Sequence, residues 1–326
     1  MWSDFTIDNY KKFTKYKLKN NNILLKYIRN ERKKIKKTIN LKAISINISE
    51  IHKDDIDIDT YIKGIYVDRE GLFNAIQTLN KIYKIAWGDN FIIIKTDTII
   101  ELDERIKYMI HIIEYLKEKT NNYKHIKIYL ILSNLKKEFP QSDKIMGIKN
   151  ANSGYNNSVS DIIFIWRKEE FEKVIFHELF HNLELDKQHD VIPEIIKTDG
   201  PHYYFEAITD FQGVMYNLIY LSLLTKVSVK NLINYELGFI RNQAMTLNDI
   251  WGLGNWHRSP ENIVEQKTAA FSYYILKYMI FEYYLTHKID LSDNYKTILD
   301  NVLSKKFIQL PFVKLSSSRM TLLQLK

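Results

Sequence analysis

Two histidines four positions apart, with a glutamate directly after the first, constrain this chain more than any other feature. They are His177, Glu178 and His181, within the run VIFHELFH at residues 174–181. A spacing of four places both imidazoles on one face of a helix, one turn apart, where they can share a metal ion. The preceding run DIIFIW, residues 161–166, is rich in the β-branched and aromatic residues typical of strands. The segment therefore predicts a strand followed by a helix that carries a metal site.

The residue types of this motif favour zinc and hydrolytic chemistry. Neutral imidazole suits tetrahedral zinc, and Glu178 lies beside the first ligand, where its carboxylate can take a proton from a metal-bound water. In chains of this composition the motif should arise by chance on the order of once per hundred sequences. The alternative is a pair of ordinary histidines on a helix. The strand and the apolar helix around the motif favour the metal site.

Two histidines need a further protein ligand, and the closest sequence patterns do not supply it. The extended metzincin motif requires glycine and histidine at positions occupied here by Glu184 and Lys187, so that class is excluded. Asp186 and His189 are near in sequence, but neither has the spacing of that motif's third ligand. The third ligand is therefore expected further along the chain.

The best candidate is Glu206, which lies 25 residues after His181 and follows a helix break at Pro201. Asp210 follows at a spacing of four on the same expected helix. One carboxylate can bind the metal while the other accepts an N–H from a ligand histidine and fixes its orientation. Taken alone, such a pair is usually a solvated helix face. Its position after the histidine motif favours the metal site.

Together, His177-Glu178-x-x-His181 and Glu206-Ala207-Ile208-Thr209-Asp210 resemble the motifs of the thermolysin-like gluzincins, a family of zinc metallopeptidases. The resemblance implies that His177, His181 and Glu206 bind one Zn²⁺, that Glu178 is the general base, and that Asp210 orients His177. It also implies a two-lobed zincin-like fold and a peptide or protein substrate. The run 150–154 is, in addition, similar to uncharacterised metallopeptidases of large DNA viruses, which would place the protein in the host cytoplasm or the virion.

The same resemblance implies two further parts of the site. Gluzincins have an edge strand before the zinc helix that binds substrate backbone, and Lys149–Tyr155 occupies that place, with Asn150, Ala151 and Asn152 as substrate-binding candidates. A surface loop rich in Asn and Gly is the alternative. The family also supplies a His or Tyr that stabilises the oxyanion. His257, in a Gly/Trp-containing loop, is favoured as this second catalytic residue over Tyr273 and Tyr274.

The chain as a whole is expected to be an α+β protein, with a mixed sheet and the zinc helix in an N-terminal lobe and a mostly helical C-terminal lobe. We expect three regions: a basic region at 1–90, an α/β region at 91–190 and a helical region at 191–326. Helices are expected near 70–87, 101–119, 168–181, 203–226, 229–243, 261–287 and 294–303, and strands near 91–94, 125–133 and 161–166.

Composition limits the partners. The net charge is +8, and residues 1–50 carry 13 Lys or Arg against 4 Asp or Glu, so the excess lies at the N-terminus. This favours either a solvated helix or a contact with a polyanion.

The chain has no cysteine, which excludes thiolate ligands, and its apolar runs are too short or too charged to span a bilayer. We expect a cytoplasmic zinc peptidase. The alternatives are a zincin-fold binding module and an amidohydrolase acting on non-peptide amides.

Overall fold

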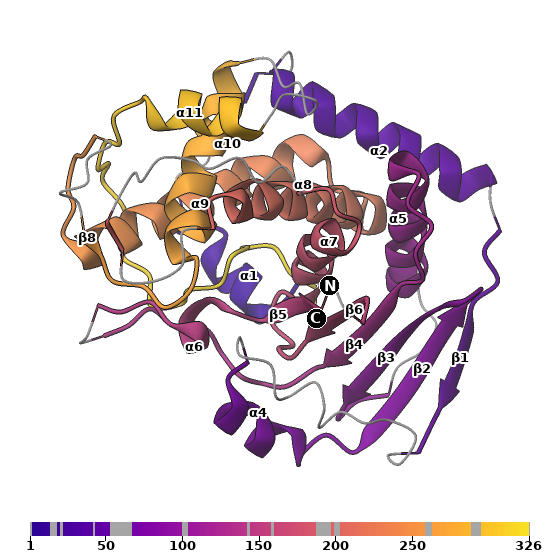
Figure 1. The fold of residues 1–326 in the computed structure, drawn as a ribbon. Coiled ribbons are helices and arrows are strands. Elements are labelled where there is room, and N and C mark those ends of the chain that lie inside the picture. The colour runs from indigo at the N-terminus through magenta and orange to yellow at the C-terminus, as the bar shows by residue number, and fades with distance from the viewer. Residues whose placement is uncertain are drawn as a thin grey trace.

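Helices and strands combine around one mixed sheet in a computed structural model (Figure 1). The structure describes residues 2–13, 18–19, 22–41, 43–52, 67–99, 104–141, 144–157, 160–186, 197–198, 203–257, 263–287 and 295–325. His189 and Pro201 lie outside these residues. The expected mixture of helix and sheet is confirmed within the described ranges.

The main sheet has six strands in the order β1-β2-β3-β4-β6-β5. Their bounds are β1 Asn47–Glu50, β2 Lys81–Trp87, β3 Asn90–Thr96, β4 Lys127–Ile131, β5 Gly154–Asn157 and β6 Ile162–Ile165. The neighbours β3, β4 and β6 run parallel, and the other pairings are antiparallel. β4 and β6 are apolar and mostly buried, as expected for inner parallel strands. β5 is left at the edge, next to β6. A second, two-stranded sheet pairs β7 Lys197–Thr198 with β8 Ile263–Val264.

Long helices cover the sheet, and two of them, α7 and α8, are buried along most of their length (Figure 1). The helices are α1 Asp4–Asn9, α2 Ile23–Leu41, α4 Arg69–Ile76, α5 Glu104–Thr120, α6 Ile148–Ala151, α7 Phe171–Asn182, α8 Phe205–Thr225, α9 Val229–Trp251, the π-helical turn η2 Phe271–Leu276, α10 Lys277–Thr286 and α11 Tyr295–Leu303. None of the helices in the described ranges combines the length and apolar composition that a bilayer crossing requires.

The helix expected over 70–87 is wrong in its second half. Helix α4 ends at Ile76, and residues 81–87 form β2, which pairs with β3 through the two-residue turn Gly88-Asp89. Gly88 has φ 53°, a conformation that favours glycine. A Gly-Asp pair between two alternating apolar runs is a hairpin signal that the helical interpretation missed.

The basic helix α2 is part of the core rather than an appendage. Its apolar side, with Leu24, Leu25, Ile28 and Ile35, is fully buried. It packs against α5, α8 and α10, and Figure 1 shows it crossing the top of the molecule beside α5. Removing the N-terminal residues would therefore expose apolar surface on the helices that α2 covers.

The C-terminal residues 318–325 are buried and tie both ends of the chain together. The carboxylate of Glu170, just before α7, accepts the N–H of Thr321 at 3.1 Å, and that of Glu236 on α9 accepts the N–H of Leu322 at 3.2 Å. Trp2 forms a β-bridge with Leu325, and the two termini lie side by side in Figure 1. These contacts hold the C-terminal segment against the residue that precedes α7.

Candidate metal centre

Helix α7 carries the histidine motif into the protein interior. It starts at Phe171, soon after β6, and most of its residues are buried, including His177 and Glu178. Buried apolar side chains such as Val174, Ile175 and Leu179 hold the helix between the sheet and α8. The predicted order of strand, helix and motif is confirmed in these residues.

Helix α8 packs against α7 beside the histidine motif and carries the two candidate carboxylates. Glu206 lies in its first turn, Asp210 one turn later and Gly213 one turn after that. A Cβ atom at Gly213 would lie 3.3 Å from the Cα, Cβ and N atoms of His177. The absence of a side chain there allows the two helices to approach closely.

The crossing brings three potential ligand atoms together. His177 Nε2 lies 3.1 Å from Glu206 Oε2, His181 Nε2 lies 3.3 Å from the same oxygen, and the two Nε2 atoms are 3.1 Å apart. Tetrahedral zinc, with bonds of 2.0–2.1 Å, separates its ligand atoms by about 3.3 Å. His177, His181 and Glu206 therefore form a triangle of the size that one zinc ion needs.

The buried carboxylate oxygen at one corner of this triangle also fits a cation. Glu206 Oε2 has no hydrogen-bond partner of good geometry among the described residues. A buried carboxylate oxygen without a donor is costly unless a positive charge satisfies it. The donor set, two imidazoles and one carboxylate, is one that zinc accepts.

The other nitrogen of each ligand histidine faces a carboxylate. His177 Nδ1 lies 3.1 Å from Oδ1 of Asp210, the residue expected to orient it, although this contact lacks good hydrogen-bond geometry. His181 Nδ1 forms a short contact with Asp186 Oδ2. These carboxylates favour a proton on Nδ1 and leave each Nε2 free to bind a metal. The role of Asp186 was missed, because sequence reasoning considered it only as a direct ligand.

Asp210 is held by two buried ammonium groups that the sequence did not single out. Lys277 Nζ donates to its Oδ2 at 2.7 Å, and Lys173 Nζ contacts its Oδ1. Burial lowers the pKa of Lys277 to about 8 and that of Lys173 well below its usual value. The pair fixes Asp210 beside His177 and balances its charge in the interior.

The pKa values of His177 and Glu178 match their expected roles. Although burial opposes the shift, the carboxylates of Glu206 and Asp186 raise the pKa of His181 well above its usual value. Burial, reinforced by the nearby Lys173, lowers the pKa of His177 to about 3, so its imidazole is neutral and can act as a ligand. Burial and the carboxylate of Glu206 raise the pKa of Glu178 to about 7, although His181 opposes the shift. A carboxyl group with this pKa can both accept and return a proton near neutral pH.

The expected edge strand is displaced along the chain. Residues 148–151 form the short helix α6, and the edge strand β5 begins at Gly154, so the strand expected over 149–155 is wrong in its first part. Asn150 is used locally: its Oδ1 accepts the N–H of Gly147 at 2.9 Å, and its Nδ2 donates to Glu138 O at 2.8 Å. These contacts favour a capped helical turn over a strand.

Ala151 and Asn152 keep a place at the site. Both line a small cavity that also contacts His177 and Glu178, whereas Asn150 does not line it. Gly154 brings β5 against α7: a Cβ atom there would lie 2.8 Å from Val174 Cγ1 and 3.1 Å from Glu178 Oε1. The edge strand therefore lies directly beside the candidate base.

The structure brings Tyr273, and not His257, to the candidate metal centre. His257 is exposed and does not line the cavity beside Glu178. The ring of Tyr273, in the π-helical turn η2, lies 5.9 Å from that of His177. Burial and the carboxylates of Glu206 and Glu178 raise the pKa of the Tyr273 phenol, which keeps it a hydrogen-bond donor. The preference for His257 is therefore corrected in favour of Tyr273, while Tyr274 donates to Ser318 O.

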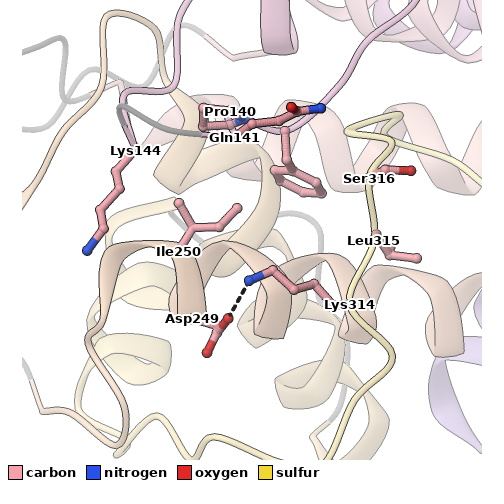
Figure 2. A pocket seen from close by; sticks show the side chains of 9 residues that line it. Pro140, Gln141, Lys144, Asp249, Ile250, Lys314, Leu315 and Ser316 are labelled. Carbon is pink, nitrogen blue, oxygen red and sulfur yellow. Dashed lines mark hydrogen bonds and ion pairs between the residues drawn. The ribbon is translucent and has the colours of Figure 1, made fainter.

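A larger cavity of about 540 Å³ lies away from this cluster (Figure 2). Its lining comes from the loop after Phe139, the end of α9 and the segment 314–316, and it includes the ion pair of Lys314 with Asp249 at 3.1 Å. None of the candidate metal ligands lines this larger cavity. The cavity is therefore not part of the candidate metal centre.

Comparison with known proteins does not identify a family: no family model, curated protein or solved structure matches the chain.

Gly213→Ala should weaken zinc binding by roughly tenfold or more. The added methyl group presses on the backbone of His177 and moves α8, with Glu206, away from the two Nε2 atoms. Zinc titration by competition with a chelating dye measures the effect, and a melting curve controls for loss of the fold. Unchanged zinc affinity would show that the helix approach does not set the ligand triangle.

Proposed function

We propose that this protein is a zinc-dependent peptidase of the gluzincin type. One observation carries the proposal: His177, His181 and Glu206 bring three ligand atoms within 3.1–3.3 Å of one another, directly beside Glu178. A purely structural zinc site is closed by four protein ligands. Within the described residues the cluster offers three, which leaves a position for water or substrate.

The residues around the metal centre suit hydrolysis by an activated water. Zinc, when held here, supplies a Lewis acid that polarises the scissile carbonyl and lowers the pKa of a bound water. Glu178 takes a proton from the attacking water and returns it to the leaving amine, as its pKa of about 7 permits. Tyr273, whose raised pKa keeps its hydroxyl protonated, donates a hydrogen bond to the oxygen that becomes negative.

The edge strand offers a way to hold an extended substrate. Among the described strands, β5 forms the edge of the sheet and pairs with β6, which is the position where an extended peptide adds as a further strand. A peptide that adds to β5 would pass Gly154, where the backbone lies close to Glu178. In this proposal the sheet carries the substrate, while the helices from α8 onward complete a two-lobed zincin arrangement.

A mixed peptide library tests the proposal most directly. The zinc-loaded protein should cleave peptides, a chelator should abolish cleavage, and added zinc should restore it. Sequencing the products identifies the bonds that are cut. If non-peptide amides are hydrolysed and peptides are not, the amidohydrolase alternative gains. If neither is hydrolysed by protein with one zinc per chain, the enzyme proposal fails and a binding module is favoured.

Helix α2 supports an additional, non-catalytic contact with a polyanion. Its solvent side exposes Lys26, Lys33, Lys36 and Lys37, and its single acidic residue, Glu31, is buried against Lys119 at 2.6 Å. Glu31 also pairs with Lys34 at 2.8 Å, which leaves the other four exposed lysines of α2 without a carboxylate from this helix. Phosphates of a nucleic acid are a suitable partner for such a face.

Replacing these four lysines with Gln should weaken binding to duplex DNA and lower its salt dependence, while peptide hydrolysis stays unchanged. Each lost phosphate contact reduces the slope of log affinity against log salt by about 0.9. A matched variant replaces four exposed lysines outside α2: Lys84, Lys144, Lys149 and Lys306. Equal losses in both variants would indicate a general charge effect, and the absence of DNA binding by the unaltered protein would refute the contact.

A further inference from the structure

A cavity of about 20 Å³ lies beside the candidate base. Its walls come from the residues that lead into the edge strand, from α7 and from four other parts of the chain: Lys137, residues 151–154, Lys173, Val174, His177, Glu178, Asp210, Tyr273 and Met320. A cavity needs roughly 10–15 Å³ to hold one water molecule. This one therefore holds about one water, or a group the size of a methyl or hydroxymethyl.

The walls of this cavity are fixed by strong contacts. Arg167 Nε donates to Asn152 O at 3.0 Å, and Thr268 Oγ1 donates to Asn152 Oδ1 at 2.6 Å. The two lysines in the wall are paired, Lys137 with Glu170 and Lys173 with Asp210. Widening the cavity on these sides would break buried hydrogen bonds or ion pairs, which is costly.

One group in the wall lacks a partner. Ser153 is 4% exposed, and its Oγ has no hydrogen-bond partner among the described residues. A buried hydroxyl without a partner favours a ligand that carries a hydrogen-bonding atom. The cavity is thus small, polar at one point, and open to a hydroxymethyl as well as a methyl group.

The position of the cavity indicates which substrate residue it takes. Val174 and Glu178 line it one helical turn apart, whereas His181 does not, so it lies toward the N-terminal end of α7 from the ligand cluster. Glu178 gives its proton to the leaving amine in the proposed reaction. The residue that supplies this amine must therefore lie beside Glu178, next to the cavity.

We infer that the protein selects peptides in which the residue after the scissile bond is glycine, alanine or serine. The inference rests on the proposed function and adds the class of substrate. Larger side chains meet walls that buried hydrogen bonds and ion pairs hold in place on most sides, and one misfitted methylene group typically costs about 10–200-fold in such pockets.

Binding of hydroxamates to the zinc-loaded protein tests the inference without requiring turnover. The probes are succinyl hydroxamates that differ only in the side chain placed beside the base: hydrogen, methyl, hydroxymethyl, isobutyl or benzyl. Calorimetry should give at least about tenfold tighter binding for the first three than for the last two. Equal or tighter binding of the isobutyl or benzyl compound would overturn the inference while leaving the peptidase proposal intact. Zinc-loaded protein that binds no hydroxamate would contradict both.

Met320→Ala should relax this selectivity. Met320 is a flexible part of the wall, with its Sδ 3.4 Å from Lys173 Nζ, and its truncation leaves the backbone contacts in place. The isobutyl compound should then bind at least about tenfold tighter than to the unaltered protein. Met279→Ala, at another buried methionine outside the cavity, is the matched control. Should Met320→Ala fail to fold, Met320→Val serves. Unchanged selectivity in a folded Met320 variant would refute the assignment of the cavity.

Discussion

Glu178→Gln is expected to bind zinc as the unaltered protein does and to lose nearly all peptide hydrolysis. The amide has almost the same shape, so the ligand triangle is preserved, but it cannot accept a proton from water. Loss of a general base typically costs about 10²–10⁴-fold in rate. Zinc content by elemental analysis and single-peptide kinetics measure the two properties separately.

A matched control is available on the same helix. Glu172 is also a buried carboxylate of α7, but it pairs with Arg105 at 2.6 Å, away from the ligand cluster. The Glu172→Gln protein should hydrolyse peptides at the normal rate when the assay temperature lies below the temperature at which this variant unfolds. An active Glu178→Gln protein would exclude Glu178 as the base, even if the zinc site is real.

Glu206→Ala is expected to abolish stoichiometric zinc binding, whereas loss of either orienting carboxylate should only weaken it. Without Glu206 the cluster keeps two protein ligands, too few for a stable zinc site. Asp210→Asn and Asp186→Asn leave all three ligands and disturb the ring orientation of one histidine each. Such losses typically reduce metal affinity about 10–100-fold.

The two orienting variants should differ in stability. Asp210 also holds Lys173 and Lys277, both buried, so Asp210→Asn leaves two ammonium groups without their carboxylate. Breaking a buried pair in this way typically costs about 3–5 kcal/mol. Among the described residues, Asp186 contacts His181 and does not pair with a buried ammonium group. Asp210→Asn should therefore melt at a clearly lower temperature than Asp186→Asn.

Zinc titration and melting curves of these variants separate the possibilities. Glu184→Gln, in the same loop as Asp186 and paired with Lys124 at 2.8 Å, is the control and should bind zinc normally. Full zinc occupancy in Glu206→Ala would end the gluzincin proposal. A severe loss in Asp186→Asn, equal to that in Glu206→Ala, would instead identify Asp186 as a direct ligand.

Parts of the metal centre were readable from the sequence because they depend on local geometry. A spacing of four on a helix places His177 and His181 on one face whatever surrounds them, and the same holds for Glu206 and Asp210. The apolar and alternating runs likewise predicted most helices and the inner strands. Residues 81–87 are one exception, because their apolar pattern is compatible with helix or strand, and pairing with β3 decides between them. The helix expected over 261–287 is also wrong in its first part, where residues 263–264 pair with β7 as β8.

The remaining parts depend on contacts between residues far apart in the chain. Tyr273 reaches His177 because η2 packs beside α8. Lys277 reaches Asp210 across the interior, and Met320 reaches the cavity from the C-terminal segment. The edge strand begins at Gly154 because a capped turn at Gly147 uses the residues before it.

The sequence by itself thus determined which side chains can bind a metal and which can act as a base, because helical periodicity is a local property. Only the tertiary structure decided how the two helices cross, which carboxylate faces which imidazole, and how little room remains beside Glu178. These features arise from close packing at Gly213 and Gly154 and from the burial of charged pairs. Their energies depend on neighbours that no local sequence pattern identifies.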